Sequence, residues 1–165
     1  MYPIFVETSP GQAAFIGVVS DTHGYYDDQL DELFAGALHI VHAGDVGSGV
    51  LPRLRALAPL TVVAGNTDPP SWEDLPWEAE AEVAGLRIIV CHIGSSLMGR
   101  HDPVAEGYDV VVSGHSHQAA AEWRGETLFL NPGSAGKARF GVPRTCAVLT
   151  TRNGDRPEPR IVTLG

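Results

Sequence analysis

Seven side chains that can bind a metal ion follow short apolar runs of this sequence. They come as an Asp-x-His pair, a Gly-Asp, a Gly-Asn, a histidine after Ile-Ile-Val-Cys and a His-x-His pair: Asp21, His23, Asp45, Asn66, His92, His115 and His117. Carboxylate, amide and imidazole groups together suit a first-row divalent ion such as Mn, Zn or Fe(II) better than Ca or thiolate-bound Zn. Seven ligands are too many for one tetrahedral ion, so the set predicts two ions that share a bridging carboxylate.

Each of these motifs is a weak signal when it is taken alone. A Gly-Asp at the end of a strand is usually a turn or a helix cap, and the stretch 65–68 (Gly-Asn-Thr-Asp) is typical of a turn. A single histidine such as His92 is more often a core residue than a ligand. The order and the intervals of the motifs favour a shared site. In extended backbone, Asp-x-His and His-x-His would each place both side chains on one side.

The elements that must position these residues are short buried strands, which helices separate in the first half of the chain. Unbroken apolar runs at 14–20, 39–45 and 60–66 alternate with helix patterns at 27–38 and 50–58. This order predicts a parallel sheet, in which ligands bind just beyond the carboxyl ends of the strands.

The second half of the chain changes to strands joined by short turns. Strands are predicted within 77–85, 86–92, 109–117, 121–134 and 145–165, with hairpin turns at 124–125 and around 153–154. The fold class predicted from the residues is therefore α/β, with two mixed β-sheets packed face to face and helices outside them.

Length and composition limit the classes of protein to which the chain can belong. Its 165 residues predict one domain over 14–165, after a flexible N-terminal leader at 1–13 that lacks the pattern of a signal peptide. The net charge of −9 argues against binding of duplex nucleic acid, and no apolar stretch approaches the ~18 residues of a membrane span. Cys91 and Cys146 lie in apolar runs, which favours reduced, buried thiols in a cytoplasmic protein.

The motifs SDTHG, HAGDV, AGNTD, CHIG, SGHSH and NPGS lie between about Ala14 and about Leu149. This series resembles the calcineurin-like metallophosphoesterases, and most of all their small single-domain bacterial and archaeal phosphodiesterases. The resemblance implies a four-layer α-β-β-α sandwich with a centre of two divalent ions. Manganese is favoured, and iron, zinc, nickel or cobalt would also suit these ligands. The resemblance assigns Asp21, His23, Asp45 and His117 to one ion, and the bridging Asp45 with Asn66, His92 and His115 to the other.

The activity implied by the resemblance is hydrolysis of a small phosphate ester, with a phosphodiester preferred. A hydroxide between the two ions would attack phosphorus in line, and Asp45, Asn66 and His92 are the catalytic candidates. The predicted substrate contacts are Asn66, the turn NPGS and a nearby arginine: Asn131, Gly133, Ser134 and Arg144, with Arg139 as a further candidate. The alternatives for these residues are a plain turn and solvated surface charges.

Two positions depart from the pattern of the family. Ile93 and Gly94 follow His92, where glycine and a further histidine are usual, and Thr67 follows Asn66, where the phosphomonoesterase branches carry a histidine that protonates the leaving group. Asp68 is expected to cap a loop or to support a ligand.

The other histidines and the tryptophans have no motif that assigns them a role. His42 is expected in the core or behind a ligand, and His39 and His101 at the surface or in structural roles. Trp72 and Trp77 flank a proline-rich loop that either walls the cleft or covers a sheet edge.

Three other functions compete with a phosphodiesterase. A phosphomonoesterase or nucleotide phosphatase would use the same ligands. A protein-interaction scaffold of the same fold would have lost one or more ligands, and all seven are present. A structural metal site would be closed and rich in thiolates, and neither cysteine belongs to the set. The sequence leaves the oligomeric state open.

Overall fold

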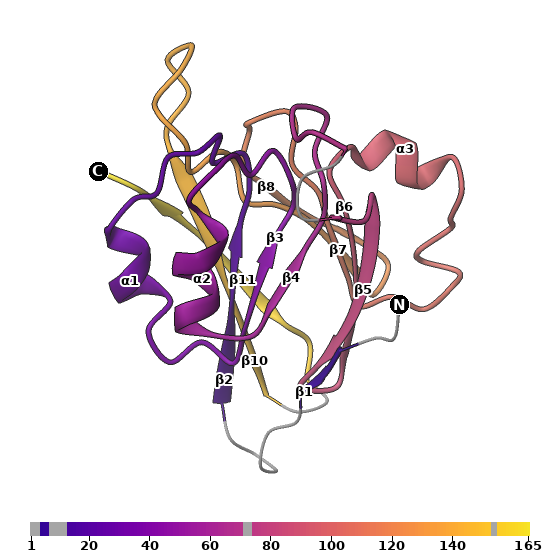
Figure 1. Cartoon of the computed structure of the whole chain (residues 1–165). Coiled ribbons are helices and arrows are strands. Elements are labelled where there is room, and N and C mark those ends of the chain that lie inside the picture. Colours follow the sequence, from indigo (N-terminus) through magenta and orange to yellow (C-terminus); the bar gives the residue numbers. More distant parts are fainter. Residues whose placement is uncertain (1–3, 7–12, 71–73, 153–154) are drawn as a thin grey trace.

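Two stacked β-sheets form the centre of the molecule in the computed structural model, which describes residues 4–6, 13–70, 74–152 and 155–165 (Figure 1). In spatial order, the six strands of the first sheet are β1 (Ile4–Val6), β5 (Glu78–Val83), β6 (Leu86–Cys91), β7 (Val110–Val112), β9 (Thr127–Asn131) and β8 (Ala120–Arg124). The five strands of the second are β11 (Glu158–Thr163), β10 (Thr145–Arg152), β2 (Ala13–Val19), β3 (His39–His42) and β4 (Leu60–Val62).

Both sheets mix parallel and antiparallel pairs. The strands β2, β3 and β4 are parallel neighbours, and so are β6, β7 and β9. The antiparallel pairs are β10 with β2, β10 with β11, β5 with β6, and β8 with β9. The predicted order of strand, helix, strand, helix and strand in the first half is confirmed, because α1 (Gln29–Leu33) joins β2 to β3 and α2 (Leu51–Leu57) joins β3 to β4.

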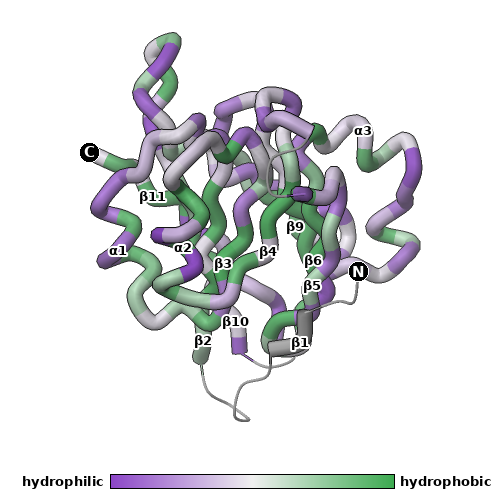
Figure 2. The backbone as a smooth tube through the Cα atoms, viewed as in Figure 1, coloured by the Kyte–Doolittle hydropathy of each residue, from purple (hydrophilic) through white to green (hydrophobic). Residues whose placement is uncertain are grey.

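Apolar side chains fill three layers between four layers of secondary structure. A central cluster lies between the sheets, a second lies under α1 and α2, and a third lies under α3 (Gly94–Met98) on the outer face of the first sheet. In β6, Ile88 and Val90 belong to the central cluster, while Ile89 and Cys91 belong to the outer one. Burial on both faces explains the unbroken apolar runs, which Figure 2 shows in green. The predicted α-β-β-α sandwich is confirmed.

The structure differs from the prediction at several element boundaries. The first helix covers only Gln29–Leu33 instead of 27–38, and Gly36 follows it with a φ of 78°. The helix α3 was not predicted, because five residues are too few to show a helical period. None of the helices in the described residues is long and apolar enough to cross a membrane.

The predicted N-terminal leader is wrong for four of its residues, because Ala13 already belongs to β2 and three others form a separate strand. Ile4–Val6 form β1, which pairs in parallel with Ala81–Val83 of β5. The unpaired N–H and C=O groups at the edge of β5 explain this pairing, which no local sequence pattern signals. Residues 1–3 and 7–12 of the leader lie outside the described residues, and so does the predicted turn at 153–154. The strands that flank this turn do pair, with Thr150 opposite Glu158.

Candidate metal centre

The loops that follow five strands meet at one end of the sandwich, the upper end in Figure 1. Asp21 and His23 follow β2, Asp45 follows β3 and Asn66 follows β4, so these four come from the second sheet. The three remaining candidates come from the first sheet and follow β6 or β7: His92, His115 and His117. Both sheets therefore contribute to the predicted site.

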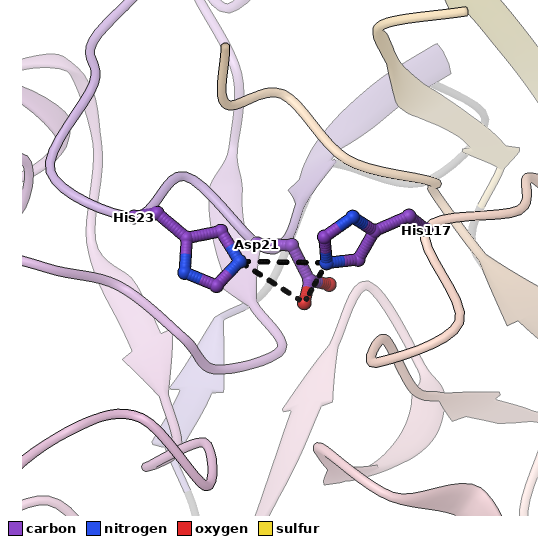
Figure 3. Close-up of side chains that lie close together, drawn as sticks. All are labelled: Asp21, His23 and His117. Atoms are coloured by element: carbon purple, nitrogen blue, oxygen red, sulfur yellow. Dashed lines mark hydrogen bonds and ion pairs between the residues drawn. The ribbon is translucent and has the colours of Figure 1, made fainter. Parts of the chain in front are cut away.

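One group of side chains joins the loop after β2 to the loop after β7 (Figure 3). The Nε2 atom of His117 lies 3.1 Å from Oδ1 of Asp21 and 3.4 Å from Nε2 of His23. The Nε2 atom of His23 lies 3.9 Å from Oδ1 of Asp21 and 3.8 Å from Oδ2 of Asp45. The two imidazole nitrogens and the carboxylate oxygen thus face a common point between them, as the ligands of one ion would.

A second group joins the loop after β3 to the end of β6. The Nε2 atom of His92 lies 3.2 Å from Oδ2 of Asp45 and 3.8 Å from Oδ1 of Asp21. The other ring nitrogen of His92, Nδ1, lies 2.7 Å from the carbonyl oxygen of Ala43, which can only accept a hydrogen bond. Nδ1 therefore carries the proton, and Nε2 presents its lone pair to the site when the ring is neutral.

Asn66 and His115 lie at the exposed side of this second group. Their Oδ1 and Nδ1 atoms are 3.1 Å apart, and the ring of His115 meets that of His92 edge to face at 5.3 Å. The structure thus brings all seven predicted ligands to one place. Asp21 belongs to both close groups, whereas the resemblance gives the bridge to Asp45, so the division between two ions stays a proposal.

Two buried atoms of the site have no hydrogen-bond partner within the described residues. They are Oδ1 of Asp21 and Nε2 of His92. A buried polar atom without a partner is costly and rare, and it indicates a missing ligand when it faces other polar atoms. Both atoms are common metal ligands and both point at the other candidates, so the site fits divalent ions well.

The charges of the site favour a bound cation. Burial raises the pKa of Asp45, but the His92 imidazole and the Thr67 N–H outweigh burial and hold this pKa well below its usual range. Burial lowers the pKa of His92, but Asp45 and Asp21 outweigh it and raise this pKa above its usual value. The Asp45 carboxylate is thus ionised at neutral pH, and a cation at the site would take the place of a proton on His92.

Five of the seven candidates have a left-handed backbone, which only a few per cent of residues other than glycine adopt. Their φ angles are 53° at Asp21, 47° at His23, 52° at Asp45, 70° at His115 and 59° at His117. The expected extended Asp-x-His and His-x-His segments are therefore wrong, because each ligand sits on a sharp turn. Hydrogen bonds from Asp21 N to Gly44 O at 3.0 Å and from His23 N to Asp45 O at 2.9 Å hold two of these turns together. Strain of this kind gathers at functional sites.

Two glycines of the motifs leave room for the carboxylates. A Cβ atom on Gly65 would lie 2.1 Å from Oδ1 of Asp45, and one on Gly114 would lie 2.6 Å from Oδ2 of Asp21. Any larger residue would push the carboxylate out of its position. This packing explains glycine in the stretches Gly-Asn and Ser-Gly-His.

Comparison with known proteins identifies the family. Residues 15–154 match the calcineurin-like phosphoesterase superfamily domain. The chain belongs to this superfamily. It is 31% identical, over 91% of its length and 92% of the relative's, to a probable metallophosphoesterase of Methanothermobacter thermautotrophicus.

Two solved structures have a similar fold. An archaeal phosphodiesterase has a TM-score of 0.69 at 25% identity, with 91% of this chain and 99% of that one covered. Vps29 of Entamoeba histolytica, solved with Zn²⁺, has a TM-score of 0.69 at 20% identity, with 90% and 98% covered. At 20% identity, the similarity to Vps29 shows the fold alone.

Behind the ligands of this superfamily member, His42 and Thr22 join two metal-binding loops. Burial lowers the pKa of His42 to about 3, so the ring is neutral and its Nδ1 accepts the Gly44 N–H at 3.1 Å. Its Nε2 then donates to the Thr22 hydroxyl at 2.9 Å, and that hydroxyl donates to the Val46 carbonyl at 2.6 Å. The expected supporting role of His42 is confirmed, and the part of Thr22 was missed.

Asp68 caps the loops that carry Asp45 and Asn66. Its carboxylate accepts the N–H groups of Val46 at 3.0 Å, Gly47 at 3.2 Å and Gly65 at 2.9 Å. The expected loop-capping role is confirmed. Thr67 is exposed, and its N–H donates to Oδ1 of Asp45 at 2.9 Å.

The side chains of the turn NPGS brace the loops that carry the candidate ligands. Asn131 donates to Gly114 O at 3.0 Å and to Ser116 Oγ at 3.1 Å, and its own Oδ1 accepts the Gly133 N–H at 2.9 Å. The Ser134 hydroxyl donates to Asp21 O at 2.9 Å. These groups have partners inside the protein, and the predicted substrate contacts of Asn131, Gly133 and Ser134 stay a prediction.

Arg144, whose substrate contact stays a prediction, also has partners inside the protein. Its guanidinium pairs with the buried carboxylate of Asp27, and its Nε donates to Gly136 O at 2.6 Å. It therefore fastens the turn after NPGS to the loop before α1. The pairing depends on residues 117 positions apart, so no local sequence signal could have found it.

The two remaining histidines are structural. His39 is fully buried and bonds to the Thr61 hydroxyl at 2.8 Å, which rules out a surface position. His101 lies between Glu78 at 2.7 Å and Glu106 at 2.9 Å. Trp77 lines a cavity beside the site, and Trp72 lies outside the described residues.

Proposed function

We propose that this protein is a metal-dependent phosphodiesterase that hydrolyses a small phosphate ester at two divalent ions, for which manganese is the favoured metal. The observation that carries the proposal is the convergence of seven ligand side chains around two buried atoms that have no partner among the described residues. When bound, the ions of such a centre activate a water molecule as the nucleophile and neutralise charge on the phosphoryl oxygens.

The residues of the chain then have distinct tasks. Asp21 and Asp45 are buried, and their negative charge would hold the cations. His92, fixed through Ala43, orients its free nitrogen toward them. Asn66 is exposed beside the imidazoles, which places its amide where it could contact a phosphoryl oxygen. Since Arg144 is paired with Asp27, Arg139 is the better candidate for an outer phosphate contact. The positive charge of Arg139 contributes to lowering the pKa of His23, and Arg139 forms no ion pair within the described residues.

The absence of an imidazole at two positions favours diesters with stable leaving groups. Thr67 and Gly94 cannot donate a proton as a histidine could, and general acid help is typically worth ~10²–10⁴-fold. A phosphodiester with an acidic alcohol needs this help least. Alkyl monoesters and protein phosphoserine need it most, so they are expected to be poor substrates.

The competing scaffold function is disfavoured by the same geometry. A protein that serves only as a scaffold does not require seven metal ligands, five of them with a strained backbone. The relatives support catalysis too, since one is a probable metallophosphoesterase and another is described as a phosphodiesterase.

Metal reconstitution of chelator-stripped protein tests the proposal. The protein is loaded separately with Mn, Fe, Zn, Ni or Co, its metal content is measured, and a panel of phosphate mono- and diesters is assayed. We expect two ions per chain and turnover of diesters that depends on the metal. Stoichiometric metal without turnover of any ester would contradict catalysis and favour a scaffold, and faster turnover of alkyl monoesters would favour a phosphomonoesterase.

A further inference from the structure

A cavity of about 200 Å³ lies directly beside the metal-centre candidates. Asn66 and His92 form the wall that it shares with the centre, and the rest of the lining includes Trp77, Ile93, Ser96 and Arg100. A group bonded to a phosphoryl oxygen at the centre would therefore enter this cavity without crossing any other element.

The walls of the cavity offer an aromatic surface for a ligand. Trp77 is 59% exposed, although an indole of this size normally gains by burial. Ile93 adds an apolar side chain where the family usually has a glycine, and Cys91 turns its thiol toward the Ile93 carbonyl at 3.4 Å. The cavity therefore suits a flat apolar group better than a second phosphate.

The position of Trp77 is fixed from two sides. Pro76 directly precedes Trp77, and its carbonyl accepts the Ala64 N–H at 2.8 Å. This bond ties the segment of Trp77 to the loop after β4, which carries Asn66. On the other side, Glu78 pairs with Arg100 at 2.9 Å and with His101 at 2.7 Å. The pairing with Glu78 also offsets the charge of Arg100, so this arginine is not free to attract an anion into the cavity.

The size of the cavity limits what it can hold. Sites that enclose a whole ligand usually measure about 300–1,000 Å³. A volume of about 200 Å³ is enough for one ring system and too small for a complete diester. We propose that this cavity is a subsite for a planar aromatic group that the substrate carries on its phosphorus, directly or through an ester oxygen, and that Trp77 stacks on this ring. The inference rests on the proposed function, because it takes the phosphoryl group to lie at the metal centre.

Two phosphonates that differ only in one group provide the test. Phenylphosphonate and methylphosphonate have the same anionic head, so both should compete with a diester for the metal-loaded protein. Stacking and burial of the ring should make phenylphosphonate bind about tenfold more tightly. Calorimetry measures the two affinities directly, and competition against diester hydrolysis shows whether both ligands occupy the active site.

Three variants make the test specific to Trp77. Trp77→Ala should abolish the preference for phenylphosphonate, while Trp77→Phe should keep most of it. Met98→Ala is the matched control, because Met98 is 41% exposed on α3 and does not line the cavity. Trp77 is exposed, so its truncation should leave the thermal stability nearly unchanged, which a melting curve checks.

The result that overturns the inference differs from the one that overturns the proposed function. Equal affinity for both phosphonates in the wild type, or an undiminished preference in Trp77→Ala, removes the subsite while diester hydrolysis stands. Absence of hydrolysis removes the proposed function, and calorimetry then still decides whether Trp77 selects the ring.

Discussion

Replacing Asp45 with asparagine tests the metal centre most directly. The carboxylate of Asp45 accepts the Thr67 N–H at 2.9 Å, and its other oxygen lies 3.2 Å from His92 and 3.8 Å from His23. Asparagine has the same shape, and its amide oxygen can still accept from Thr67. The substitution therefore removes one negative charge with little change in packing.

The size of the effect follows from Coulomb's law. Two unit charges about 4 Å apart interact by about 4 kcal/mol at the effective dielectric constant of about 20 that suits protein sites. The ion carries two charges, so this value is a lower bound. Because about 1.4 kcal/mol corresponds to a factor of ten in affinity, the loss of this charge should weaken metal binding at least about a thousandfold. Turnover should fall by a similar factor, since the loss of a principal charge-stabilising group typically costs about 10²–10³-fold.

Metal content after dialysis and diester turnover are the two measurements. The matched control is Asp27→Asn, which removes another buried carboxylate that pairs with Arg144 and not with the imidazoles. We expect this control to melt at a lower temperature and to keep its metal. Two tightly bound ions and full activity in Asp45→Asn would show that this carboxylate is not a ligand of the centre.

Further substitutions test the neighbouring assignments. If each histidine serves a different ion, His115→Ala and His117→Ala should empty different sites in anomalous scattering, and loss of the same ion in both would refute the division. Thr67→His should raise kcat/KM selectively for esters with basic leaving groups, and equal gains across leaving-group pKa would exclude a general acid role. Asn131→Ala should lower kcat through the loosened loop without abolishing phosphonate binding, and a pure KM effect would instead support its predicted role as a substrate contact. The carboxylates of Glu106 and Glu78 raise the pKa of His101. The contribution of His101 to stability should therefore be present at about pH 5.5 and lost as the pH rises through that raised pKa. An equal difference in unfolding free energy between wild type and His101→Gln at about pH 5.5 and about pH 8.5 would contradict this.

The ligands could be predicted from the sequence because each follows a buried strand. Apolar runs that repeatedly end in a carboxylate, an amide or an imidazole are not what surface turns require, and the parallel order of β2, β3 and β4 brings such ends together. The left-handed turns at these positions were not predictable, because Asp and His adopt them only when hydrogen bonds from another loop hold them, as Gly44 O does for Asp21. A local sequence pattern does not show which distant residues will form these bonds.

The same reason explains why the partners of two predicted substrate contacts, Asn131 and Arg144, could not be predicted from the sequence. The sequence shows that Asn131 lies in a turn and that Arg144 is a nearby cation, and both are typical of phosphate sites. Their partners, Gly114 and Asp27, lie 17 and 117 positions away. Which polar groups remain free for a substrate is decided by these long-range bonds, so the sequence predicts the metal ligands better than the residues around them.

The metal centre should also stabilise the fold, because its ligands come from both sheets. Asp21 and Asp45 follow strands of one sheet, and His92 and His117 follow strands of the other. Without metal, two of their buried atoms have no partner among the described residues, which penalises the folded state. A cation that binds only the folded protein adds about 2.7 kcal/mol at a concentration of 100 times its Kd. We therefore expect the melting temperature of stripped protein to rise by several degrees with saturating metal, and to rise much less in Asp45→Asn. An equal rise in both proteins would mean that the ions bind elsewhere.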